Sequence, residues 1–96
     1  MNELAFKIKA DFLRVLAHPI RLRILDLLKK GENNVGSIAK ELNIPQSSLS
    51  KHLLDLRGAG ILHARQQATV IFYSIADPDI FKILLPIAVI LRKNSS

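Results

Sequence analysis

Residues 35–60 read VGSIAKELNIPQSSLSKHLLDLRGAG, and this stretch is the strongest indication of the fold in the sequence. Apolar residues recur at spacings of three and four over 35–42 and again over 46–57, which predicts two short helices. Between them, Asn43 suits a left-handed helix end and Pro45 suits a helix start. Two short helices joined by a tight turn form a helix-turn-helix.

The segment that follows favours β-structure. Residues 61–66 and 70–75 are short β-prone runs, and Gln67-Ala68-Thr69 connects them. Such a pair predicts a β-hairpin, although no Asn-Gly or Asp-Gly fixes the turn type.

Further helices are expected on both sides of this centre. Helical apolar patterns cover about 4–16, 19–30 and 78–91, with Asp77 as the N-cap of the last helix. Glu32-Asn33-Asn34 is expected to be a polar loop. The fold class is therefore mostly α with a β-hairpin wing, a winged helix-turn-helix, and residues 1–96 form a single domain.

Composition narrows the classes of partner. The 96 residues carry 14 Lys and Arg against 8 Asp and Glu, a net charge of +6, which favours nucleic acid or an acidic membrane surface. Hydrophobic residues make up 49% of this short chain, and a dimer interface would accommodate the excess. The absence of cysteine excludes disulfides, thiolate metal sites and thiol-based redox sensing.

The sequence also bears on location. The N-terminus lacks the basic and apolar regions of a signal peptide, and the near-apolar stretch 83–91 is too short to span a bilayer and contains Pro86. We therefore expect a cytoplasmic protein with no membrane partner.

The helix predicted over 46–57 has a surface suited to DNA. If Leu49, Leu53 and Leu56 pack inward, the residues that point mostly outward are Ser47, Ser48, Lys51 and Asp55, and Gln46 and His52 flank the inward row. The first two turns are thus small, polar or basic on their outer side. A slim polar helix start fits a major groove, and its free N–H groups attract phosphate. The alternative is that Pro45-Gln46-Ser47-Ser48 is simply a good helix start.

Three stretches resemble ArsR/SmtB-type regulators: LAHPIRLRIL at 16–25, IPQSSLSKHL at 44–53 and LRGAGIL at 56–62. They occur in the family's order and spacing, and the match extends over about 12–85. The resemblance implies a homodimer formed through the first and last helices, about 4–16 and 78–92. It also implies repression from palindromic operators, and release of DNA when an effector binds.

The resemblance implies contacts to DNA as well. In the recognition helix these would be Gln46, Ser47, Ser48, Lys51 and His52; in the wing, Arg65, Gln66, Gln67 and Thr69. The Gln-Gln-Ala tip is poorer in Arg and Gly than the family's usual wing, which indicates weaker wing readout. Arg57 would either reach a phosphate or cap its helix, while Arg21 and Arg23 would either contact DNA or lie on a solvated face.

The metal sites of the family are not matched. The thiolate site would need cysteines near Asn34 and Gly36. At the site on the last helix only Asp77 matches, since Asp79, Ile90 and Lys93 occupy the other positions, and neither Ile nor Lys binds zinc. The three histidines form no cluster in the sequence. We expect no metal cofactor, leaving an organic ligand, a protein partner or no effector.

The final helix indicates assembly. Residues 80–91 are apolar on almost every face apart from Lys82, so a helix there needs a partner to cover it. Its polar face is too poor in Lys and Arg to favour membrane binding. Pro86 is expected to kink or split the helix.

Taken together, these features predict a homodimeric, sequence-specific transcriptional regulator that binds double-stranded DNA, most simply as a repressor on a palindromic operator. The alternative is a winged-helix protein-interaction module with weak, non-specific DNA binding. An enzyme is not expected, because no Cys nucleophile, paired acid and base, or Gly-rich phosphate loop is present.

Overall fold

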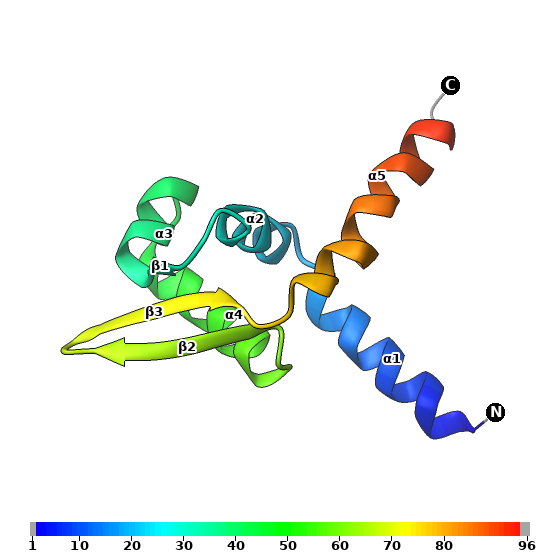
Figure 1. Cartoon of the computed structure of the whole chain (residues 1–96), viewed down its shortest axis with the longest axis horizontal. Helices are drawn as coiled ribbons and strands as arrows, with labels where there is room; N and C mark the ends of the chain where they lie inside the picture. Colours follow the sequence, from blue (N-terminus) through cyan, green and yellow to red (C-terminus); the bar gives the residue numbers. More distant parts are fainter. Residues whose placement is uncertain (1, 95–96) are drawn as a thin grey trace.

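The computed structural model describes residues 2–94. In chain order its elements are α1 (Glu3–Leu16), α2 (Pro19–Leu28), β1 (Asn33–Asn34), α3 (Val35–Leu42), α4 (Gln46–Gly58), β2 (Leu62–Gln67), β3 (Val70–Ile75), η1 (Pro78–Ile80) and α5 (Phe81–Asn94). The helices α2, α3 and α4 gather beside the hairpin, while α1 and α5 project away from this body in different directions (Figure 1). The arrangement confirms the predicted winged helix-turn-helix.

The core lies beneath α4. Leu49, Leu53 and Leu56 are at most 1% exposed, as their spacing predicts. They pack with buried residues from α2, α3 and the base of the wing: Ile24, Leu25, Leu28, Ile38, Leu42, Ile61, Leu62 and Tyr73. Each fully buried aliphatic side chain stabilises the fold by about 1.5–3 kcal/mol. The inner face of α4 is thereby fixed, and its outer face is held at the surface.

The turn between α3 and α4 follows the predicted chemistry. Asn43 has a φ of +56°, and the N–H of Ile44 donates to the carbonyl of Ala39 at 3.1 Å. This is the left-handed helix end at which Asn is tolerated. Pro45 then starts α4, and its carbonyl accepts from the N–H groups of Ser48 and Leu49, each at 3.1 Å. These bonds set the direction in which α4 leaves the turn.

Within residues 2–94 the sheet has three strands in the order β1-β3-β2. The expected polar loop over 32–34 is therefore wrong in part, because Asn33 and Asn34 pair with Tyr73 and Phe72. Two asparagines have neither the length nor the residue types that predict a strand, and their pairing depends on the approach of β3. Asn34 also caps α3 by accepting from the N–H of Ser37 at 2.9 Å.

The hairpin turn is tighter than predicted. Strand β2 extends to Gln67, which pairs with Val70, so that only Ala68 and Thr69 connect the strands. Ala68 has a φ of +56°, and Thr69 is not among the residues of positive φ. One positive φ at the first central position matches a type II′ turn, where Gly is the favoured residue.

The last helix differs from the expected single helix over 78–91. Asp77 caps it as predicted, accepting from the N–H of Asp79 at 2.9 Å, but the first turn is the 3₁₀ helix η1. The following α5 continues through Pro86 to Asn94, so the expected split at Pro86 is wrong. A proline removes one backbone donor from the helix, and the remaining bonds suffice to continue it.

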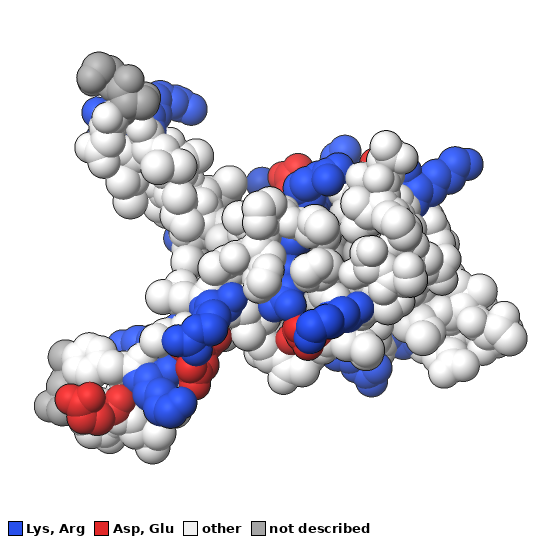
Figure 2. Space-filling model, turned by 180° about the vertical axis from the view of Figure 1, so that it is seen from behind, with Lys and Arg blue, Asp and Glu red and all other residues white. Residues whose placement is uncertain are grey.

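The two projecting helices keep most of their apolar surface exposed. Among the described residues of α5 none is buried, and in α1 only Leu16 is. The exposed side chains include Leu4, Phe6, Ile8, Leu13, Ile83, Leu85, Ile87, Val89, Ile90 and Leu91. Figure 2 shows the α5 arm as white below its basic tip. No helix in the described part of the chain is long and apolar enough to cross a membrane.

Candidate nucleic-acid interface

The first two turns of α4 form an exposed polar surface. Gln46, Ser47, Ser48 and Lys51 are all exposed, while Leu49 beneath them is buried. The side chain of Lys51 is 79% exposed. The first N–H groups of a helix have no acceptor inside it, so this end of α4 attracts anions. The structure thus gathers four of the predicted contact residues on one accessible face.

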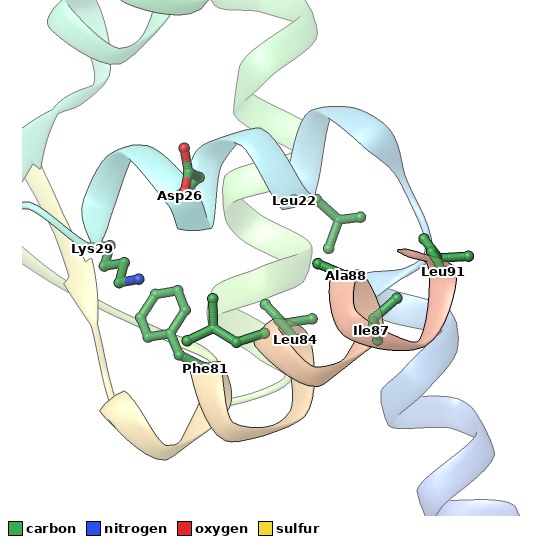
Figure 3. A pocket seen from close by; sticks show the side chains of 9 residues that line it. Leu22, Asp26, Lys29, Phe81, Leu84, Ile87, Ala88 and Leu91 are labelled. Carbon is green, nitrogen blue, oxygen red and sulfur yellow. The ribbon is translucent and has the colours of Figure 1, made fainter. Parts of the chain in front are cut away.

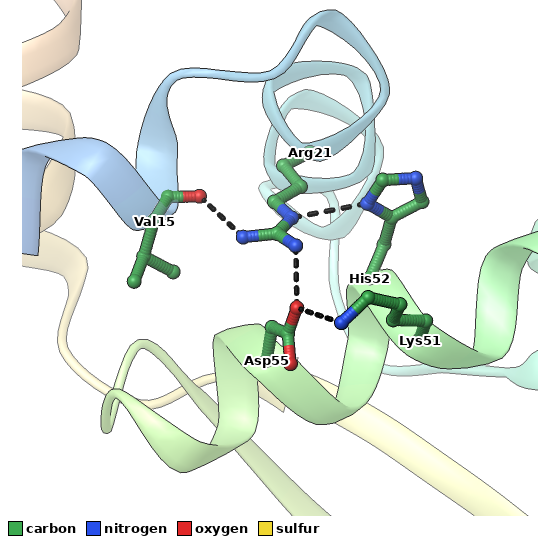
Figure 4. Close-up of polar contacts among 5 residues, drawn as sticks. All are labelled: Val15, Arg21, Lys51, His52 and Asp55. Atoms are coloured by element: carbon green, nitrogen blue, oxygen red, sulfur yellow. Dashed lines mark hydrogen bonds and ion pairs between the residues drawn. The ribbon is translucent and has the colours of Figure 1, made fainter.

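Lys51 shares the carboxylate of Asp55 with a second cation, Arg21. Its Nζ donates to Oδ2 of Asp55 at 3.2 Å, and Nη2 of Arg21 donates to the same oxygen at 2.6 Å (Figure 4). The hydrogen bond and charge of Lys51, together with the charge of Arg21, lower the pKa of Asp55 below its usual value. Asp55 is therefore a carboxylate at neutral pH and is shared by two cations.

His52 lies at the side of α4 and not on its exposed face. It is half-buried, and its Nδ1 accepts from Nε of Arg21 at 3.0 Å. The ring of His18 is tilted against it, with the centroids 5.7 Å apart. Burial is the main cause that lowers the pKa of His52, with the charge of Arg21 second. His52 is thus a neutral acceptor turned toward α2.

The structure overturns both roles expected for Arg21. This residue is only 5% exposed, so it lies neither on a solvated face nor within reach of DNA. Besides His52 and Asp55, it binds the carbonyl of Val15 at the end of α1 through Nη1 at 2.9 Å. Arg23 remains exposed and donates to the carbonyl of Leu42 at 2.9 Å, at the end of α3. No spacing in the sequence indicates that α2 directs Arg21 under α4.

The polar residues of the wing bind one another. Nε and Nη2 of Arg65 donate to the two carboxylate oxygens of Glu32 at 2.7 and 2.6 Å, and Nη1 donates to Oε1 of Gln67 at 2.9 Å. The guanidinium also lies 4.5 Å from the ring centroid of Phe72. The bond from Arg65 lowers the pKa of Glu32 and keeps it ionised.

At the tip of the wing, Gln66 donates to the carbonyl of Ala68 at 3.1 Å, and Thr69 is exposed in the turn. The hairpin from Gln66 to Ile71 contains no charged residue. The basic and acidic groups in Figure 2 likewise lie interleaved rather than as one basic stripe. Within residues 2–94, Thr69 is therefore the one predicted wing contact whose side chain makes no internal hydrogen bond.

Arg57 lies in the last turn of α4 and is exposed. Backbone N–H groups satisfy the helix end, with Ala59 donating to Asp55 at 3.1 Å and Ile61 to Leu56 at 3.0 Å. Within residues 2–94 no bond joins the Arg57 guanidinium to these carbonyls. The contact of Arg57 with a phosphate stays a prediction.

The residues in place of the family's metal ligands do not suit a metal. Asp77 is used as a helix cap, and Asp79 pairs with Lys82 at 3.1 Å. Ile90 offers no donor atom, and Lys93 is a cation. In the described part of the chain no three His, Cys, Asp or Glu residues form a group that could hold a metal ion.

A hollow of about 300 Å³ lies between α2 and α5 (Figure 3). Leu84 and Ala88 lie on the side of Leu22, whereas Phe81 lies at the other end, where Nζ of Lys29 is 5.3 Å from its ring centroid. The lining is apolar apart from Asp26 and Lys29, and it is continuous with the exposed apolar surface of α5.

Known proteins resemble this chain in sequence over most of its length. Residues 18–64 match the model of the bacterial regulatory protein, arsR family. The chain is 42% identical to the HTH-type transcriptional regulator Rv0081 of Mycobacterium tuberculosis over 84 residues, covering 86% of this chain and 74% of that protein. It is also 42% identical over 82 residues to the transcriptional repressor PagR of Bacillus anthracis, covering 81% and 82%.

Solved structures agree with the fold. The crystal structure of Rv0081 superposes with a TM-score of 0.84 at 39% identity, covering 96% of this chain and 93% of that one. A solution structure described as a homodimeric winged helix-turn-helix DNA-binding domain, Mb0332 from Mycobacterium bovis, also gives a TM-score of 0.84. Its identity is 27%, with 100% of this chain and 92% of that one covered.

Proposed function

Because the chain belongs to the ArsR family of bacterial regulatory proteins, we propose that it represses transcription as a homodimer bound to a palindromic operator. The chain is a transcriptional regulator with a DNA-binding winged helix, and not an enzyme. The observation that carries the proposal is the exposed polar face of α4, held above a fully buried leucine row. The likeness to PagR, named a repressor, supports the direction of control.

The homodimer is proposed from the two apolar arms. Isolated exposed leucines are ordinary, but α1 and α5 together expose a long series of large apolar side chains. A second copy of the chain would cover them and extend a core that is small on its own. The homodimeric state of the Mycobacterium bovis domain supports this interface. With two-fold symmetry, each α4 would meet one half-site, about 34–36 Å from the other.

For the contacts, we propose that Gln46, Ser47, Ser48 and Lys51 enter the major groove, with His52 at its edge. Arg57 would bind a phosphate at the far end of α4. Arg65, Gln66, Gln67 and Thr69 would approach the backbone or the adjacent minor groove, and Arg65 would have to leave Glu32 to do so. We place this function in the cytoplasm, in the presence of the chromosome.

Control without a metal cofactor is part of the proposal, supported by the unsuitable donors at Asp79, Ile90 and Lys93. Addition of zinc or cadmium to the protein–operator complex is expected to leave the operator Kd unchanged. A change in the operator Kd on addition of low micromolar metal would contradict this part of the proposal alone.

The experiment that tests the function is selection of bound fragments from genomic DNA, followed by measurement of Kd over a range of salt. We expect a two-fold symmetric site, and a log–log salt slope of several units from the phosphate contacts. A reporter gene behind the selected site should fall when the protein is expressed; a rise would make it an activator.

The same experiment tests the alternative function. Weak binding with no preference for sequence, despite the net charge of +6, would indicate a winged-helix protein-interaction module. Nothing in the arrangement of α4 favours that module over the proposed regulator.

A further inference from the structure

Asp55 lies one helical turn after Lys51, on the helix proposed to enter the major groove. A carboxylate at this place acts against DNA binding in two ways. It repels phosphate, and it offers an internal partner to the lysine that should bind phosphate. The structure nevertheless places a second cation, Arg21, on the same oxygen of Asp55.

The two cations hold Asp55 differently. Arg21 makes the shorter bond, 2.6 Å against 3.2 Å, and its side chain is 6% exposed while that of Lys51 is 79% exposed. An exposed ion pair is weak and is screened by salt, whereas a buried one is screened much less. A phosphate approaching α4 therefore competes readily for Lys51 and hardly at all for Arg21.

Arg21 is also held in place from other sides. Its Nη1 donates to the Val15 carbonyl at 2.9 Å and its Nε to His52 at 3.0 Å, so the guanidinium has partners on α1 and α4 (Figure 4). A guanidinium fixed in this way keeps its fork directed at Asp55 whether or not Lys51 is present.

We propose that Arg21 is a positioning residue for DNA binding: it acts as the permanent counterion of Asp55 and thereby frees Lys51 to bind a DNA phosphate. The inference rests on the proposed function, in which Lys51 contacts DNA. Without Arg21, Asp55 retains Lys51 as its counterion and keeps a negative charge beside the backbone of the DNA. The residue acts through Asp55 and Lys51 and does not itself touch the nucleic acid.

The test is a double-mutant cycle on the Kd for the selected operator, measured at several salt concentrations. In the wild-type background, Lys51→Ala should weaken binding several-fold and reduce the salt slope by about 1. In an Arg21→Met background, Lys51→Ala should change Kd less than about twofold, because Lys51 is already held by Asp55. Adding Asp55→Asn to Arg21→Met should restore the effect of Lys51→Ala, which a merely structural role of Arg21 would not produce.

Arg23→Met is the matched control, because Arg23 is on the same helix and binds the Leu42 carbonyl instead of Asp55. The effect of Lys51→Ala should be unchanged in that background. Folding of each variant is checked by circular dichroism and thermal melting. Should Arg21→Met fail to fold, Arg21→Gln removes the same charge while keeping a hydrogen-bond donor, with the same expected outcome.

The outcomes distinguish a failure of the inference about Arg21 from a failure of the proposed function. An undiminished effect of Lys51→Ala without the Arg21 charge would overturn the inference and leave the proposed function standing. No effect of Lys51→Ala in the wild-type protein would instead overturn the proposed role of Lys51 in DNA binding.

Discussion

The start of α4 and the wing are both proposed to contact DNA, yet the structure prepares them differently. On α4, within the described residues, the side chains of Gln46, Ser47 and Ser48 make no internal hydrogen bond and lie above a buried row of leucines. Lys51 has an exposed partner, Asp55, that a phosphate could replace. In the wing, Arg65 is bound to Glu32, Gln67 and the Phe72 ring. The start of α4 can therefore contact DNA as it stands, whereas the wing must first break the internal contacts of Arg65.

The largest effect should come from removing the support of α4. Leu53→Ala is expected to cost about 2–5 kcal/mol of unfolding free energy, because a large cavity forms under the helix. Ile71→Ala, on the 38% exposed outer side of the wing, should cost less than about 1 kcal/mol. Denaturant titration measures both; equal losses would contradict the claim that Leu53 lies in the core and Ile71 outside it.

The next effect concerns DNA directly. Gln46→Ala combined with Lys51→Ala should weaken operator binding about 10- to 100-fold, since it removes a base-edge contact and a phosphate contact. Gln67→Ala combined with Thr69→Ala at the wing tip should weaken it less than about threefold. Fluorescence anisotropy with a labelled operator compares the pairs, and a larger loss from the wing pair would reverse the order proposed for the two regions.

Releasing Arg65 from Glu32 should increase the contribution of the wing to DNA binding. Glu32→Gln removes the carboxylate that holds Arg65, so operator affinity should rise about two- to fivefold at low salt and the salt slope should increase by about 1. Glu41→Gln on α3 removes an equal charge without freeing a wing arginine and serves as the control. If both variants gain affinity equally, net charge and not the release of Arg65 explains the gain.

A smaller effect is expected at the turn of the wing. Ala68→Gly should raise the unfolding free energy by about 0.5 kcal/mol, because a positive φ costs Ala more than Gly. Operator affinity should not change, since the backbone shape is kept. A thermal melt measures the gain; a fall in Tm would show that the flexibility of Gly in the unfolded chain outweighs the relief of strain.

The smallest effect is the pH dependence of stability that arises from His52 of α4. The folded protein lowers the pKa of His52 through burial and the charge of Arg21, with smaller contributions from His18 and Lys51 that Asp55 opposes. The stability due to neutral His52 is therefore complete above the unfolded value near 6.5, and is lost as pH falls through the lower folded value. Tm measured from pH 8 to 5 should fall less in His52→Gln than in the wild type; an equal fall in the two proteins would contradict this role of His52.

Local signals were sufficient for the frame of this molecule. The leucine spacing of α4, the left-handed Asn43 and the helix start at Pro45 are properties of neighbouring residues, and each was predicted from them. The exposed face of Gln46, Ser47, Ser48 and Lys51 follows from the same periodicity.

Long-range contacts were not predictable in this way. Arg21 and Asp55 are separated by 34 residues and Glu32 and Arg65 by 33, and nothing in their local sequence pairs them. Strand β1 depends likewise on β3, which lies about forty residues downstream. The expected split at Pro86 is wrong for the opposite reason, because the rest of α5 continues the helix past this residue.

The exposed apolar surfaces of α1 and α5 also affect how the amount of active regulator depends on the rate at which the chain is synthesised. In the proposed homodimer, α1 and α5 are covered only after two chains meet, so the population of finished molecules grows with the square of chain concentration while chains are scarce. A lone chain offers its apolar helices to proteases and to aggregation. Repression should therefore begin at a threshold of expression instead of rising in proportion to it, which gives the regulator a steep dose response.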